Sequence, residues 1–126
     1  MARLSKSRIM SSLQCLKKVH LEIHRKDLVH YSPRTLANFQ LGHDIGDLAI
    51  EIYGNGQGEF IPFEGGLGKA ERRTRELLDG LFKAPVFEAT LSHQGVLVRE
   101  DVLLPNGDSW DIIEVKASTK LKEEHI

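Results

Sequence analysis

The sequence predicts an α+β domain in which N-terminal helices pack on a three-stranded antiparallel meander. Apolar residues recur at helical spacing in the segments up to Phe82, whereas the residues after Pro85 are strand-like almost to the end of the chain. Short turn signals at Ser92–Gly95 and at Asn106-Gly107 divide this second part into three strands. Successive strands joined by such short turns pair antiparallel, which gives the meander.

The length and composition are those of one globular domain spanning residues 1–126. With 40% of its residues apolar and 28% charged, the chain can bury one modest core and is not expected to be disordered. No stretch approaches the ~18 apolar residues of a membrane span, so no membrane partner is expected. The N-terminus also lacks the continuous apolar segment of a secretory signal. The single cysteine, Cys15, excludes an intramolecular disulfide, and we expect a cytoplasmic protein.

The charge is distributed unevenly along the chain. Residues 1–34 carry eight lysines and arginines against two acidic residues, a net charge of +6, whereas residues 35–126 carry nine against sixteen, a net charge of −7. We therefore distinguish a basic helical N-terminal segment, 1–34, from the core helices and sheet, 35–126. A basic segment beside an acidic remainder indicates a polyanionic partner, and a solvated basic helix is the alternative.

Four helices are predicted before the strands. Ser5 has the side chain of an N-cap and precedes apolar residues at helical spacing, which predicts a first helix. The segment Cys15–Arg25 fits both a helix and an alternating strand, and we favour the helix. Longer helices are predicted for Thr35–Tyr53 and for roughly Gly68–Phe82.

Two glycines lie inside the predicted helix Thr35–Tyr53. Gly42 and Gly46 are four residues apart, and each costs up to about 1 kcal/mol of helix stability relative to alanine. Glycine inside a helix therefore requires an explanation. The simplest explanation is that another backbone, such as that of a packed sheet, approaches this face of the helix closely.

The last hairpin determines where three charged side chains fall. If Asn106-Gly107 forms the loop, Asp101 pairs with Ile112 and Glu114 pairs with Arg99. Paired residues project to one side of a sheet, and so do residues two apart on one strand. Asp101, Glu114 and Lys116 then share a face. The two carboxylates are diagonal neighbours, with roughly 7–8 Å between their backbone positions.

This arrangement suits a divalent metal site. A hard cation such as Mg²⁺ binds one or two carboxylates together with water and substrate phosphate. Lys116 could position the attacking water or neutralise the charge that develops on a phosphoryl group. The alternative is that Glu114 and Lys116 form part of an exposed sheet face with Arg99.

The hairpin with its Asp…Glu-Val-Lys pattern, preceded by helices and a strand, resembles the PD-(D/E)XK nuclease superfamily. The resemblance is to the RecB-like and CRISPR-associated exonuclease branch, in an uncharacterised bacterial subgroup. It extends over essentially the whole chain. The similar segments are LSKSRIMSSLQCLKKVHLEIHR, LGHDIGDLA, VFEATLSHQGVLVREDVLLP and WDIIEVKAST.

The resemblance implies a partial restriction-endonuclease-like core that hydrolyses DNA phosphodiesters with Mg²⁺ or Mn²⁺. It implies metal ligation by Asp101, by Glu114 and by the backbone carbonyl of Val115. It also implies a catalytic role for Lys116, with Glu88 as an auxiliary acidic residue. Relatives with an iron–sulfur cluster use four cysteines, of which only Cys15 has a counterpart here, so no cluster is expected.

The chain departs from the family pattern in two places. Relatives often carry a histidine metal ligand in the first core helix, where this chain has Gly46, and His43 lies three residues earlier. The family core also continues with a helix and a strand after the lysine, whereas ten residues follow Lys116. We therefore expect a core truncated after the Glu-Val-Lys motif, with an uncovered sheet edge that allows self-association.

Three functions stay open at this point. The first is metal-dependent DNA hydrolysis. The second is a non-catalytic nucleic-acid-binding or protein-interaction remnant of such a nuclease, which would use the basic N-terminal helices. The third is a purely structural α+β domain, which would be favoured if Asp101 and Glu114 lay on opposite faces of the sheet.

Overall fold

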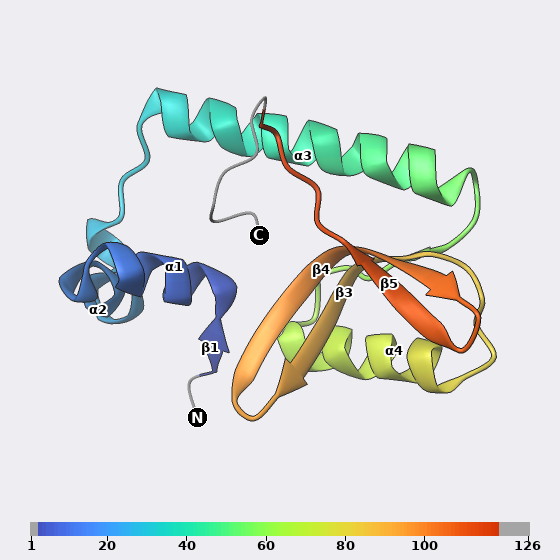
Figure 1. The fold of residues 1–126 in the computed structure, drawn as a ribbon. Coiled ribbons are helices and arrows are strands. Elements are labelled where there is room, and N and C mark those ends of the chain that lie inside the picture. Colours follow the sequence, from blue (N-terminus) through green and yellow to red (C-terminus); the bar gives the residue numbers. More distant parts are fainter. Residues whose placement is uncertain (1–2, 119–126) are drawn as a thin grey trace.

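The computed structural model describes residues 3–118 and confirms the α+β class (Figure 1). In chain order the elements are β1 Leu4–Ser5, α1 Lys6–Gln14, α2 Leu16–His24, the short 3-10 helix η1 Lys26–Leu28, α3 Pro33–Gly54, β2 Glu59–Phe60, α4 Leu67–Asp79, β3 Val86–His93, β4 Val96–Asn106 and β5 Ser109–Ile113.

The sheet contains the predicted meander and extends it. Strands β3, β4 and β5 pair antiparallel in succession, as expected from the short turns between them. Two further strands run parallel to their neighbours: β1 pairs with β4, and β2 pairs with β3. The sheet is therefore mixed rather than purely antiparallel. Both added strands are two residues long, which is too short to produce an alternating pattern in the sequence.

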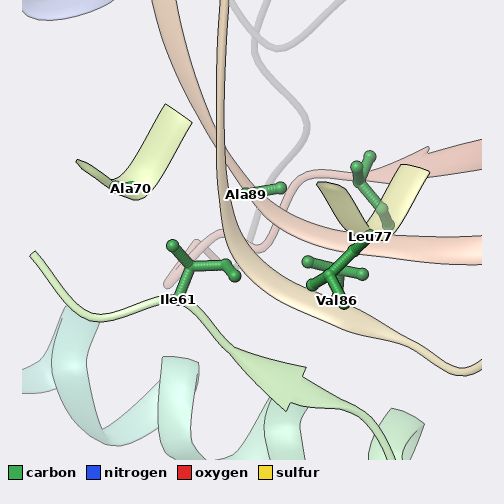
Figure 2. Packing of buried hydrophobic residues seen from close by; sticks show 6 residues of the cluster. Ile61, Ala70, Leu77, Val86 and Ala89 are labelled. Atoms are coloured by element: carbon green, nitrogen blue, oxygen red, sulfur yellow. The ribbon is translucent and has the colours of Figure 1, made fainter. Parts of the chain in front are cut away.

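Helices α3 and α4 lie on opposite faces of the sheet, and α1 and α2 lie beside it (Figure 1). The face toward α4 packs around buried residues that include Ile61, Leu77 and Val86 (Figure 2). The face toward α3 packs around Ala49, Phe87 and Val102. The sheet thus has an apolar core on both sides.

The helix ends follow capping rules. The Ser5 hydroxyl accepts a hydrogen bond from the Arg8 amide at 3.4 Å, which confirms the predicted N-cap. The segment Cys15–Arg25, which fits both a helix and a strand, contains the helix α2, so the favoured prediction is confirmed. The predicted extension of α4 to Phe82 is wrong, because the helix ends at Asp79 before Gly80 and leaves Leu81 97% exposed. Within residues 3–118, no helix combines the length and apolar character that crossing a lipid bilayer requires.

The predicted register of the last hairpin is wrong by two residues. Asn106 pairs with Ser109, so the loop is Gly107-Asp108 rather than Asn106-Gly107. Gly107, the first loop residue, has a φ of 59°, a left-handed conformation that favours glycine. The observed pairing places Leu103, not Asp101, opposite Ile112. A shift of two residues keeps each paired side chain on its face, because strands repeat with a period of two, but the observed ladder ends at Val102 and Ile113 and includes neither Asp101 nor Glu114.

Candidate functional site

The candidate site lies at a gap in one edge of the sheet. Along this edge of β4, β1 pairs with Val96 and Leu97, and β5 pairs with residues 102–106. The intervening stretch, 98–101, has no strand partner on that edge among the described residues. The chain leaves the sheet at both borders of the gap, at Lys6 after β1 and at Glu114 after β5. The prediction that Glu114 and Lys116 belong to the last strand is therefore wrong.

Glu114 is held by two lysines at this gap. The Lys116 ammonium donates to Glu114 Oε1 at 2.5 Å, and Lys6 forms a short hydrogen-bonded ion pair with the same oxygen. Glu114 Oε2 has no hydrogen-bond partner among residues 3–118. Partial burial raises the pKa of Glu114, but the hydrogen bonds from Lys116 and Lys6 outweigh it, so the pKa lies below its ordinary value.

A second carboxylate ties the chain after β5 to β4. Asp101 Oδ2 accepts a hydrogen bond from the Val115 amide at 2.6 Å. Strand β5 ends at Ile113, two residues before Val115, so no backbone pairing with β4 continues there. The hydrogen bond to the Asp101 side chain takes its place and keeps residues 114–116 beside β4. The other oxygen of Asp101 has no hydrogen-bond partner in the described part of the chain. Asp101 and the Glu-Val-Lys segment are thus physically linked.

Glu88 occupies a strained position opposite Asp101. Its neighbours pair normally, Phe87 with Val102 and Ala89 with Glu100, but the Glu88–Asp101 position of the ladder is skipped. Glu88 has a φ of 57°, which is left-handed for a residue other than glycine and costs about 1–3 kcal/mol. Such strain is found most often at functional sites.

Arg99 lies at the centre of this region, a position that sequence reasoning did not assign to it. Its Nε and Nη2 donate to Glu88 Oε2 at 3.1 and 2.9 Å. The guanidinium carbon lies 5.4 Å from the centroid of the Phe63 ring. Its Nη1 is buried and has no hydrogen-bond partner among residues 3–118. A buried guanidinium N–H without a partner is costly, and a phosphate oxygen is the kind of acceptor that would satisfy it.

Two cavities adjoin at Arg99. The α3 cavity, about 320 Å³, has walls from Glu88, Arg99, Asp101 and Val115 on one side and from α3, including His43, on the other. The β1 cavity, about 490 Å³, is lined by Lys6, Leu97, Arg99, Glu114 and Lys116 among others. Leu97, Arg99 and Asp101 alternate along β4 and share a face, so both cavities open on the same side of this strand.

The structure thus groups the predicted site residues in two adjoining places. Glu88, Asp101 and Val115 line the α3 cavity, and Glu114 and Lys116 line the β1 cavity. Asp101 and Glu114 are near enough for the charge of each to act on Lys6. Within residues 3–118, no three histidine, cysteine, aspartate or glutamate side chains form a group that could hold a metal ion.

The explanation offered for the two helix glycines is wrong. A Cβ added at Gly42 or at Gly46 would meet no heavy atom within 4 Å, so no backbone approaches them closely. Both glycines instead line the α3 cavity, and their missing side chains leave this wall of the cavity open. His43, which sequence reasoning did not promote to a metal ligand, lines the same cavity.

Lys6 was also missed, and no local signal in the sequence could have found it. It lies 108 residues from Glu114 and reaches it only because β1 adds to the sheet edge.

Comparisons with known proteins identify no family. A scan against protein-family models, a search of curated proteins and a search of solved structures each return no match. The fold and the site residues together define the protein only as an α+β domain with a charged site at the edge of a mixed sheet.

The ion pairs of Glu114 predict a pH dependence of stability. Because the folded-state pKa of Glu114 is lowered, its contribution is present above the unfolded-state pKa of about 4.3 and is lost as the pH falls through the folded-state value. We expect Lys6→Gln to reduce the free energy of unfolding by about 1 kcal/mol or less at neutral pH. The deficit should shrink as the pH falls from neutral to about pH 3, because a rising fraction of Glu114 is then protonated.

Urea unfolding of parent and variant at both pH values checks this expectation. Burial and the neighbouring Glu114 raise the pKa of Glu100, whereas Lys6 lowers it, so the pH dependence of the deficit reports the loss of Lys6 from both carboxylates. A deficit that stayed constant from neutral to acidic pH would contradict the assignment of Lys6 to Glu114.

Proposed function

We propose that this protein hydrolyses phosphodiester bonds of DNA in a reaction that depends on a divalent metal ion. The observation that carries the proposal is the hydrogen bond from the Val115 amide to Asp101, which fixes the Glu-Val-Lys segment beside the aspartate. This contact joins, in space, the two parts of the pattern that resembles the PD-(D/E)XK nucleases. The cation Arg99 lies beside them with a buried nitrogen that has no hydrogen-bond partner among residues 3–118.

The residues present fit a Mg²⁺ or Mn²⁺ ion. Asp101 and Glu114 each keep one carboxylate oxygen without a hydrogen-bond partner in the described part of the chain. These oxygens, with the backbone carbonyl of Val115, would hold the ion, and water would complete the coordination that Mg²⁺ prefers. When bound, the ion would supply a water molecule of lowered pKa and stabilise negative charge on the phosphoryl oxygens.

The protein's own side chains have separate roles in this proposal. When substrate is bound, Lys116 exchanges its contact with Glu114 for a hydrogen bond to the phosphoryl group or to the attacking water. Its positive charge there stabilises the negative charge that develops on the phosphoryl oxygens. Arg99 donates a hydrogen bond from Nη1 to a phosphate oxygen. Glu88 holds the guanidinium in place through its two hydrogen bonds and so acts as a positioning residue.

The open wall of α3 gives the substrate room. Gly42 and Gly46 carry no side chain where the helix borders the α3 cavity. A phosphate backbone could approach the helix there more closely than it could approach side chains.

The test is cleavage of end-labelled single-stranded and double-stranded DNA by the parent protein. We expect products with Mg²⁺ or Mn²⁺ and none with excess EDTA. Asp101→Asn, purified in the same way, controls for contaminating nucleases and should be inactive. Cleavage that persisted in EDTA, or that was equal in the variant, would overturn the assigned site.

The second candidate is a protein that binds nucleic acid without cleaving it. The observation in its favour is that Lys6 and Lys116 both form ion pairs with Glu114. DNA binding without cleavage under every metal condition would support this candidate over hydrolysis.

A further inference from the structure

A groove separate from the two cavities lies between α2 and the beginning of α3. It has a volume of about 730 Å³ and is lined by Lys17, Lys18 and Arg25 from the α2 side and by Tyr31 and Phe39 from the α3 side. Figure 1 shows α3 running from beside α2 to a position over the sheet. The groove therefore lies at one end of the helix whose middle borders the α3 cavity.

Two aromatic rings are presented at this groove. Tyr31 is 55% exposed and Phe39 is 48% exposed, and their ring centroids lie 5.1 Å apart in an edge-to-face arrangement. Exposed aromatic rings in a groove are platforms on which unpaired bases stack. The bases of a duplex already stack on each other, so such platforms favour single strands.

Positive charge lies beside the rings. Lys17 has no ion-pair partner among residues 3–118, and Lys18 is 3.9 Å from Glu22. Arg25 makes two hydrogen bonds to Asp27, at 2.9 and 2.6 Å. The three cations outnumber the two carboxylates that pair with them, Glu22 and Asp27, so the net positive charge at the groove attracts an anion.

The groove and the α3 cavity are aligned along one stripe of α3. Thr35 and Phe39 line the groove, and His43, Gly46 and Ile50 line the cavity. Successive members of this series are three or four residues apart, which places them on one face of the helix. Phe39 and His43 are separated by one turn, about 6 Å of helix rise. One extended strand could follow this face from the groove to the cavity.

We propose that the α2–α3 groove binds a single-stranded segment of nucleic acid, with a base stacked on Tyr31, whose ring packs edge-to-face with Phe39, and with phosphates at Lys17, Lys18 and Arg25. This inference rests on the proposed function, because it assumes that nucleic acid is the substrate. It adds a strand-holding site outside the reaction site and a preference for unpaired bases.

The first experiment measures binding without cleavage. Fluorescence anisotropy of a labelled oligothymidylate of about 12 nucleotides is recorded in EDTA, so that no metal-dependent reaction occurs. We expect Tyr31→Ala to weaken binding about tenfold, because one stacking platform is lost. Tyr53→Ala is the matched control, since Tyr53 is 39% exposed near the other end of α3, and it should bind like the parent. An abasic strand of equal length should bind parent and Tyr31→Ala alike.

The salt dependence tests the cations independently. Lys17→Gln should lower the slope of log affinity against log salt by about 0.7, the value for one phosphate contact on a single strand. Lys69→Gln, on the exposed side of α4, removes the same charge elsewhere and should leave the slope unchanged. Circular dichroism of each variant establishes that the fold is retained.

Cys15 gives a direct readout of occupancy. It is exposed, it lines the groove, and it is the only cysteine in the sequence. Bound oligothymidylate should slow alkylation of Cys15 by a maleimide, whereas a duplex of equal length should protect it less.

Equal binding by Tyr31→Ala and Tyr53→Ala, or equal protection of Cys15 by duplex and single strand, would overturn the groove proposal. These results differ from failure of the proposed function. Tyr31-dependent binding without cleavage in Mg²⁺ would overturn hydrolysis alone. Metal-dependent cleavage that is indifferent to Tyr31 would overturn the groove alone.

Discussion

Replacing Lys116 with glutamine is expected to lower the rate of Mg²⁺-dependent DNA cleavage by about 100-fold or more, with little change in stability. Losing one group that stabilises developing charge typically costs 10²–10³-fold in rate, roughly the range expected here. The Lys116 side chain is 41% exposed and contacts Glu114, so no buried packing is lost. The measurement is single-turnover cleavage of labelled DNA, with the free energy of unfolding determined in parallel.

Lys6→Gln is the matched control for this substitution. Lys6 and Lys116 contact the same oxygen of Glu114, so each variant removes one cation from that carboxylate. Only Lys116 is proposed to act on the phosphoryl group. If both variants lost activity to the same extent, the two lysines would act through Glu114 alone, and the proposed role of Lys116 would be wrong.

The largest expected effect on stability is that of Phe87→Ala, about 3–5 kcal/mol of unfolding free energy. Phe87 is 2% exposed and lies in the cluster with Ala49 and Val102 that joins α3 to the sheet. The backbone at Gly54 and Gly58 packs closely against the Phe87 ring. A Cβ added at Gly54 would come within 3.2 Å of Phe87, and one at Gly58 within 2.9 Å.

Urea unfolding followed by circular dichroism measures this loss. Phe60→Ala is the control, because Phe60 is 50% exposed, and it should cost about 1 kcal/mol or less. If Phe87→Ala cost no more than Phe60→Ala, the packing of α3 on the sheet through Phe87 would be contradicted.

The helices and the meander could be predicted because their signals are local. Capping at Ser5, helical spacing and short turns each act within a few residues. The hairpin register could not be predicted from the preference for Asn-Gly turns alone, because Gly107 also fits the first position of a Gly107-Asp108 loop. The hairpin register does not position Glu114 in any case, because β5 ends at Ile113, and the structure places Asp101 in the α3 cavity and Glu114 in the adjoining β1 cavity.

The remaining parts of the site depend on contacts between distant segments. Strands β1 and β2 are too short to leave a pattern, and β1 is what brings Lys6 to Glu114. The position of Arg99 between two cavities depends on Glu88, whose left-handed backbone no sequence rule foresees. The open space beside Gly42 and Gly46 likewise depends on how α3 packs over the sheet, which the sequence of the helix does not determine.

Binding of Mn²⁺ tests the proposed metal site most directly, and electron paramagnetic resonance of the free ion measures it without any substrate. We expect the parent protein to bind Mn²⁺ and Asp101→Asn to bind it at least tenfold more weakly. Asp111→Asn, which alters an exposed carboxylate on β5 that contacts Asn106, should bind like the parent. Equal Mn²⁺ binding by all three proteins, or none by the parent, would contradict a metal site at Asp101.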